Sequence, residues 1–259
     1  MTFRVSVAQQ PLVWQDAAAN RAHFATVLAP LAGNTDLVVL PEMFTTGFTM
    51  QPETHAEGAD GPSRAWLLEQ ARTLDAAVGG SVAVNENGRY YNRFMLAMPG
   101  GLTYWYDKRH LFRMGGEHRH YSAGIHALIV EWRGARLCPL VCYDLRFPVW
   151  SRRRPELEYD VVLYSANWPA ARRFAWTSLL RARAIENQAY CVGVNRVGDD
   201  GLGVAHVGDS AVLDYTGQPL LELNDKAQVA TVPLDLESLR AWRDRFPAHL
   251  DADAFSLTP

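Results

Sequence analysis

The sequence predicts an α/β fold with a mixed sheet, and three observations lead to this prediction. A short, wholly apolar run at 37–40 has the character of a strand buried on both faces, and 160–165 is a further apolar strand. Segments with helical periodicity alternate with these runs. A tight turn at Glu86-Asn87-Gly88 joins two strand-like stretches and indicates that the sheet is not purely parallel. With 259 residues and no internal repeat or linker, the chain is expected to form one domain over 1–259.

The first elements are expected to be a strand at 5–9, where apolar and polar residues alternate, and a helix capped by Asp16. Four apolar residues at helical spacing form the buried face of this helix: Phe24, Val27, Leu28 and Leu31. Pro30 favours the end of the helix before the next strand. A second helix is predicted from Pro62. One side of it carries four apolar residues: Leu67, Ala71, Leu74 and Val78.

The remaining elements are mostly strands. They are predicted at the following ranges: 80–85, 90–98, 102–106, 127–132, 135–142, 160–165, 190–195, 206–214 and 228–233. One pair of them is expected to turn at Arg133-Gly134, and further helices are predicted after Pro148 and over 176–189.

Composition and charge narrow the possible functions. Hydrophobic residues make up 48% and charged residues 20%, as in an ordinary globular protein. The formal net charge of -3 gives no basic excess for nucleic acid, and a solvated face explains the short run Arg152-Arg153-Arg154. The start lacks the apolar stretch of a secretion signal, and no run approaches the roughly 20 apolar residues of a membrane span. We therefore expect a cytoplasmic protein that binds neither nucleic acid nor membrane.

Glu42, Lys108 and Cys142 each stand at or just beyond the end of a predicted strand. Ligand-binding and catalytic groups in α/β proteins gather where strands end. Each residue alone has an ordinary explanation, namely a helix cap or surface charge, a solvated lysine and a small buried hydrophobe. The three together, far apart in sequence but in equivalent positions, favour a catalytic carboxylate, amine and thiol.

The other two cysteines are expected to be core residues. Three cysteines do not make a disulfide framework. Cys138 and Cys142 are separated by about 13 Å if the segment is a strand, at roughly 3.3 Å per residue, which is too far for a disulfide or a shared metal ion. Cys191 begins an apolar strand. No metal site is therefore predicted.

Longer segments around these residues resemble the nitrilase superfamily of carbon–nitrogen hydrolases. The similarity covers nearly the whole chain and rests on five segments: 40–42 (LPE), 106–112 (YDKRHLF), 142–148 (CYDLRFP), 181–187 (RARAIEN) and 190–198 (YCVGVNRVG). It implies a four-layer α-β-β-α sandwich and a catalytic triad of Glu42, Lys108 and Cys142. It also implies a second glutamate between the lysine and the cysteine, for which Glu117 is the candidate.

The segments 116–121 and 143–148 are similar to the ω-amidase branch of this superfamily. This branch hydrolyses the terminal amide of 2-oxoglutaramate and 2-oxosuccinamate. The resemblance also implies a homodimer or a higher homo-oligomer.

Amide hydrolysis explains why these residue types are needed. A thiol with a free pKa of about 8.5 is mostly protonated at neutral pH. Glu42 is expected to take the proton of Cys142, pass it to the departing nitrogen and later activate water against the thioester. Lys108 and the backbone N–H of Tyr143 would stabilise the oxyanion. Glu117 would orient Lys108 or the leaving amide, unless it is an ordinary surface charge. This chemistry requires no metal or organic cofactor.

Arg146 lies four residues after the nucleophile and is the candidate for binding a substrate carboxylate. Alternatively, Arg146 pairs with Asp144 or braces the loop. Phe48, Phe112 and Trp168 are candidates for the wall of the pocket, although core packing explains aromatic residues equally well.

The predicted site does not by itself separate several alternatives. Hydrolysis of a nitrile, an N-carbamoyl amine or another aliphatic amide would use the same groups, and acyl transfer to an amine shares the thioester. A non-catalytic scaffold would not need all three residues. A Cys–His hydrolase would use His110 or His118, but neither has a papain-type setting. The expected function is therefore hydrolysis of a small linear amide by water, as in an ω-amidase.

Overall fold

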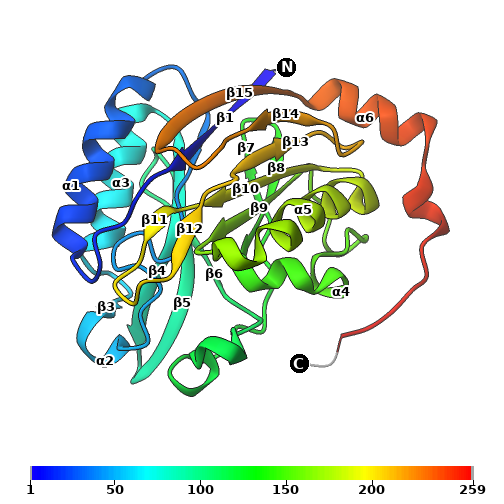
Figure 1. The fold of residues 1–259 in the computed structure, drawn as a ribbon. Coiled ribbons are helices and arrows are strands. Elements are labelled where there is room, and N and C mark those ends of the chain that lie inside the picture. Colours follow the sequence, from blue (N-terminus) through cyan, green and yellow to red (C-terminus); the bar gives the residue numbers. More distant parts are fainter. Residues whose placement is uncertain (1, 258–259) are drawn as a thin grey trace.

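The computed structural model describes residues 2–257, which form two packed β-sheets covered by helices on their outer faces (Figure 1). The layers follow the order helix, sheet, sheet, helix, so the predicted four-layer α-β-β-α sandwich is confirmed. Because each sheet is covered on both faces, its central strands are apolar throughout rather than alternating.

The first sheet has the order β15-β1-β2-β4-β5-β6, with β3 paired to β4. Its strands are β1 (Thr2–Gln9), β2 (Leu37–Val39), β3 (Glu57–Gly58), β4 (Ala77–Glu86), β5 (Arg89–Ala97), β6 (Thr103–Asp107) and β15 (Gln228–Asp235). β1, β2 and β4 are parallel, and β15, β5 and β6 are antiparallel to their neighbours. The sheet is therefore mixed, as the hairpin turns predicted.

The second sheet has the order β14-β13-β10-β9-β8-β7. Its strands are β7 (Val130–Trp132), β8 (Ala135–Val141), β9 (Val161–Ala166), β10 (Tyr190–Asn195), β13 (Ala211–Leu213) and β14 (Pro219–Glu222). The three central strands β8, β9 and β10 are parallel. A separate two-stranded ribbon consists of β11 (Val197–Asp199) and β12 (Ala205–Val207).

Two helices, α1 (Ala17–Leu28) and α3 (Pro62–Leu74), cover the first sheet, and α5 (Arg173–Asn187) with the short α4 (Pro148–Ser151) covers the second (Figure 1). Asp16 caps α1 as predicted, because its Oδ1 accepts a hydrogen bond from Ala19 N at 2.9 Å. The other α-helices among the described residues are α2 (Pro52–His55) and α6 (Leu236–Arg245). Within residues 2–257, no helix is both long and apolar enough to cross a membrane.

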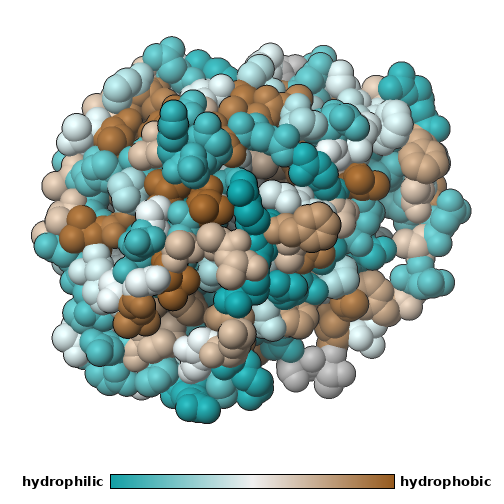
Figure 2. Space-filling view, viewed as in Figure 1, coloured by the Kyte–Doolittle hydropathy of each residue, from teal (hydrophilic) through white to brown (hydrophobic). Residues whose placement is uncertain are grey.

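The strand β2 shows why its residues are apolar without alternation. Leu37 and Val39 point into the core between the two sheets, whereas Val38 and Leu40 point toward α1 and α3. Figure 2 shows that on one face of the molecule the apolar side chains are scattered among polar ones. The main apolar surface is thus buried between the four layers.

Several predicted elements differ from the structure. Leu31 does not lie on α1, which ends at Leu28, and β7 covers only Val130–Trp132 of the strand predicted at 127–132. Val78 does not lie on α3, because Asp75 adopts a left-handed conformation with φ 51° that ends the helix, and Val78 belongs to β4. The predicted strand 206–214 is split into β12 and β13, because Gly208 and Asp209 both have positive φ. The chain changes sheet at this point.

Candidate active site

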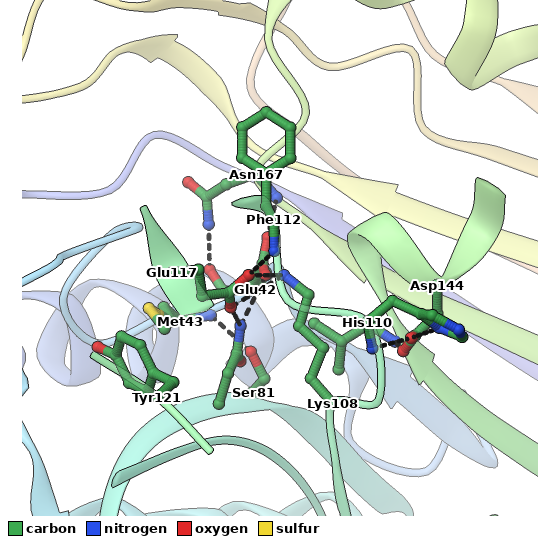
Figure 3. Close-up of polar contacts among 12 residues, drawn as sticks. Glu42, Met43, Ser81, Lys108, His110, Phe112, Glu117, Tyr121, Asp144 and Asn167 are labelled. Atoms are coloured by element: carbon green, nitrogen blue, oxygen red, sulfur yellow. Dashed lines mark hydrogen bonds and ion pairs between the residues drawn. The ribbon is translucent and has the colours of Figure 1, made fainter. Parts of the chain in front are cut away.

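The ends of strands from both sheets bring the predicted catalytic residues together. Glu42 follows β2, Lys108 follows β6, and Cys142 follows β8. Lys108 lies beside Glu42 in Figure 3, and its Nζ donates a hydrogen bond to Glu42 Oε1 at 2.8 Å. Asn167, at the end of β9, donates from its backbone N to Glu42 Oε2 at 2.9 Å. The Glu42 carboxylate therefore spans the gap between the two sheets.

Lys108 is buried and is held by two carboxylates. Besides Glu42, its Nζ contacts Glu117 Oε1 at 3.0 Å and Oε2 at 2.8 Å. All three side chains are buried. Burial alone would lower the pKa of Lys108, but the charges of Glu117 and Glu42 outweigh it and raise the pKa. Lys108 is therefore a permanent cation.

Glu117 begins the short 3-10 helix η3 (Glu117–Arg119) and is completely buried, so the alternative of a surface charge is wrong. Its Oε2 also accepts a hydrogen bond from Phe112 N at 2.5 Å, and its Oε1 accepts one from Asn92 Nδ2 at 2.9 Å. Burial raises the pKa of Glu117, and Lys108 opposes this effect. Every contact of this carboxylate comes from a donor, which is the pattern of an ionised group.

Cys142 lies at a sharp turn between β8 and the 3-10 helix η4 (Cys142–Arg146). Its φ of 43° is uncommon for a residue with a side chain. Burial and the neighbouring Glu42 carboxylate raise the pKa of the thiol, whereas Lys108 lowers it. The resting group is therefore a neutral thiol beside a carboxylate that can accept its proton.

Asp144 fixes this turn and was not singled out as a site residue by sequence reasoning. Its Oδ2 accepts hydrogen bonds from Val141 N at 3.0 Å and from Tyr106 Oη at 2.8 Å. Its Oδ1 accepts one from His110 N at 2.9 Å (Figure 3). Asp144 thus ties the turn that carries Cys142 to the segment that carries Lys108. Its place two residues after the nucleophile was the available signal.

The other cysteines are buried as predicted. Cys138 lies in β8 and Cys191 in β10, and both are completely inaccessible in the core. Burial raises the pKa of Cys138 to about 12. Across residues 2–257, no three His, Cys, Asp or Glu side chains are grouped as a metal ion would require.

A pocket of about 170 Å³ leads to Cys142 and Glu42. The predicted aromatic residues line it, namely Phe48, Phe112, Tyr143 and Trp168. Other lining residues escaped sequence reasoning: Asn167, Arg172, Asp200 and His206. Asn167-Trp168 follows β9 directly, so the strand-end pattern that marked Glu42 could also have marked Asn167.

Arg146 lies in this pocket with its guanidinium 5.0 Å from the centre of the Trp168 ring. It makes no hydrogen bond or ion pair to any side chain among the described residues, and the alternative that it pairs with Asp144 is wrong. Arg172 lies 5.2 Å from the Phe112 ring and likewise has no carboxylate partner within residues 2–257. Within residues 2–257 neither arginine forms an ion pair, although the Asp200 carboxylate also lines the pocket.

An α-β-β-α sandwich with a glutamate, a lysine and a cysteine gathered between its sheets is the architecture of enzymes that hydrolyse carbon–nitrogen bonds. The family model described as carbon-nitrogen hydrolase matches residues 4–244. The chain belongs to this family.

Individual relatives are similar over most or all of their length. The ω-amidase YafV of Yersinia enterocolitica is 52% identical over 264 residues, which cover 99% of each chain. The 2-oxoglutaramate amidase of Bacillus subtilis is 34% identical over 84% of this chain and 85% of its own. A crystal structure of a CN-hydrolase superfamily protein from Xanthomonas campestris, with an arsenic adduct in its active site, matches with a TM-score of 0.98 at 48% identity over 100% of both chains. The protein is therefore an enzyme that hydrolyses carbon–nitrogen bonds of amides.

Proposed function

We propose that this protein is an ω-amidase in which Cys142, Glu42, Lys108 and Glu117 release ammonia from the terminal amide of 2-oxoglutaramate or 2-oxosuccinamate. One observation carries the proposal: the buried Glu42–Lys108–Glu117 cluster opens into a pocket that also contains Arg146, which forms no ion pair among residues 2–257. The cluster supplies the groups for amide cleavage, and Arg146 supplies a cation for the other end of an acidic substrate.

In the first half of the reaction, the Cys142 sulfur attacks the amide carbonyl carbon while its proton passes to Glu42. The carbonyl oxygen becomes an oxyanion beside Lys108, and the N–H of Tyr143 lies in the first turn of η4, where such groups lack intrahelical acceptors. Glu42 then donates the proton to the nitrogen, the carbon–nitrogen bond breaks, and ammonia leaves. The product of this half-reaction is a thioester on Cys142.

In the second half, Glu42 takes a proton from water, and the resulting hydroxide attacks the thioester carbonyl. Lys108 again faces the oxyanion, and the carbon–sulfur bond breaks with return of the proton to the sulfur. The overall reaction converts an amide and water into a carboxylic acid and ammonia. Glu117 touches Lys108 through both carboxylate oxygens and orients it throughout.

The pocket suits a short linear substrate with a carboxylate at its far end. Phe48, Phe112 and Trp168 form an apolar wall for the methylene groups, and the Arg146 guanidinium can bind the carboxylate with two parallel hydrogen bonds. The names of the Yersinia and Bacillus relatives, ω-amidase and 2-oxoglutaramate amidase, support the same substrate class. We further propose that residues 1–259 form one hydrolase domain. The same proposal holds that the protein is a homodimer and is located in the cytoplasm.

Ammonia release from 2-oxoglutaramate tests this function. The initial rates for 2-oxoglutaramate, 2-oxosuccinamate, glutamine, butyramide and butyronitrile are measured with the same enzyme preparation. We expect kcat/KM to be highest for the two oxo-acid amides. A preference for butyramide or butyronitrile would overturn the ω-amidase proposal.

A further inference from the structure

Asn92 lies in the middle of β5 at the base of the Glu42–Lys108–Glu117 cluster and is completely buried. The β5–β6 pairing continues to this point, because Lys108 N donates to Asn92 O at 2.9 Å. The next residue, Arg93, instead pairs with Glu86 and Asp107 away from the site. Strand alternation therefore directs Asn92 toward the cluster and Arg93 away from it.

The Asn92 amide nitrogen bridges the two carboxylates. Its Nδ2 donates to Glu42 Oε1 at 2.8 Å and to Glu117 Oε1 at 2.9 Å. Lys108 Nζ contacts the same two oxygens at 2.8 and 3.0 Å. Two nitrogen donors thus alternate with two carboxylate oxygens in a closed ring, and the orientation of the amide is fixed because its flipped form would direct an oxygen at two anions.

The other end of this amide has no partner. Asn92 Oδ1 is buried and accepts no hydrogen bond within the part of the chain that the structure describes. An unsatisfied buried acceptor costs stability. A side chain that served packing alone would not need this polar end, so the two N–H groups are the functional part of Asn92.

Two carboxylates and one ammonium group leave the cluster with one excess negative charge. Lys108 carries one positive charge between two carboxylates, and all three side chains are buried. Hydrogen bonds from a neutral donor favour the ionised form of a carboxylate, whereas a nearby like charge favours protonation. The Asn92 amide also acts to lower the pKa of Glu117.

We propose that Asn92 is a positioning residue whose amide N–H groups keep Glu42 and Glu117 ionised on either side of Lys108, so that Glu42 is free to accept the Cys142 proton. The inference rests on the proposed function of Glu42 as a base. The titratable groups around the amide are Glu42, Lys108, Glu117 and Cys142, and the Glu117 charge also helps to raise the pKa of Tyr121.

The test is the pH dependence of kcat/KM for 2-oxoglutaramate in Asn92→Leu, which keeps the approximate volume and removes both donors. The acid limb reports protonation of the carboxylate cluster as a whole. Loss of hydrogen bonds to the ionised form raises the pKa, so we expect the acid limb to move up by about one to two pH units. At pH values below the shifted limb, the activity of Asn92→Leu should be roughly 10- to 100-fold lower than that of the parent. Above pH 8 it should largely return to the parent's activity.

A second measurement needs no substrate. The rate of Cys142 alkylation by iodoacetamide is followed against pH, with Cys142→Ala to confirm that the buried Cys138 and Cys191 do not react. The midpoint should move up in Asn92→Leu together with the kinetic acid limb. If the parent releases no ammonia from 2-oxoglutaramate, the proposed function fails, but the alkylation midpoint still tests the role of Asn92.

Asn20→Leu is the matched control, because Asn20 is also completely buried and its Nδ2 donates to Val13 O and Thr45 O outside the cluster. We expect it to lower Tm without moving the acid limb. If Asn92→Leu does not fold, Asn92→Asp replaces it, since the added acid should move the limb in the same direction and further. An Asn92 variant with the acid limb of the parent and only a lower kcat or Tm would overturn the proposal.

Discussion

At the inner end of the pocket, Lys108 donates to two carboxylates, whereas in the outer half Arg146 and Arg172 have no carboxylate partner among residues 2–257. The inner charges are buried and fixed by hydrogen bonds before any substrate binds. Catalytic dipoles held in this way need no reorganisation during the reaction. The guanidinium of Arg146 lies over the Trp168 ring and that of Arg172 over the Phe112 ring and beside Met114 Sδ, so both remain available to an anion. The inner end is thus built for the reaction and the outer half for recognition.

The largest effect on activity is expected for substitution of Cys142, the nucleophile at the inner end of the pocket. Cys142→Ala should abolish ammonia release and leave Tm within a few degrees of the parent, because the thiol forms the thioester. Its control is Cys138→Ala on β8, the strand that precedes Cys142, which should lower Tm and leave kcat nearly unchanged because that side chain is packed in the core. Activity of a pure Cys142→Ala protein within tenfold of the parent would remove it as the nucleophile.

Lys108→Met should come next in size. Losing one oxyanion donor typically costs roughly 10²–10³ in rate, and here two carboxylates also lose their shared cation. Steady-state kcat/KM with any accepted amide measures the loss. Lys226→Met, at an exposed lysine, is the matched control and should retain the activity of the parent. An unchanged kcat/KM in Lys108→Met would show that the inner cluster has only a structural function.

Arg146→Met should separate recognition from chemistry. A charged hydrogen bond contributes about 1.5–3 kcal/mol, so kcat/KM for a carboxylate-bearing amide should fall roughly 10- to 150-fold. A neutral amide of the same length should lose much less, because the inner end is untouched. Equal losses for both substrates would mean that Arg146 braces the loop after Cys142 instead.

The smallest effect is expected for Arg172→Met, at the partly exposed outer edge. Exposed charge pairs contribute about 0.2–1 kcal/mol, so kcat/KM for the acidic amide should fall only roughly 1.5- to 5-fold. The loss should shrink further at high ionic strength because salt screens exposed charges. A loss as large as that of Arg146→Met, without dependence on salt, would assign the substrate carboxylate to both arginines.

Sequence patterns predicted many elements of this fold and the residues of the inner cluster, but not the partners that complete it. Local periodicity located β2 and α5, and the strand ends indicated Glu42, Lys108 and Cys142. Asn92 escaped because it lies within a strand, where an asparagine has no local signature. Asp144 was considered only as a partner for Arg146, although the structure connects it to His110 and Tyr106.

The sequence by itself determined the α/β class, the strand ends at which the reactive side chains stand, and the family to which those motifs belong, because hydrophobic periodicity and short motifs are local properties of the chain. Only the tertiary structure decided that Glu117 is buried, that Asn92 bridges two carboxylates and that Arg146 has no ion-pair partner within residues 2–257. These features depend on the packing of two sheets against each other. Burial and charge balance arise from contacts between distant segments, which no local pattern records.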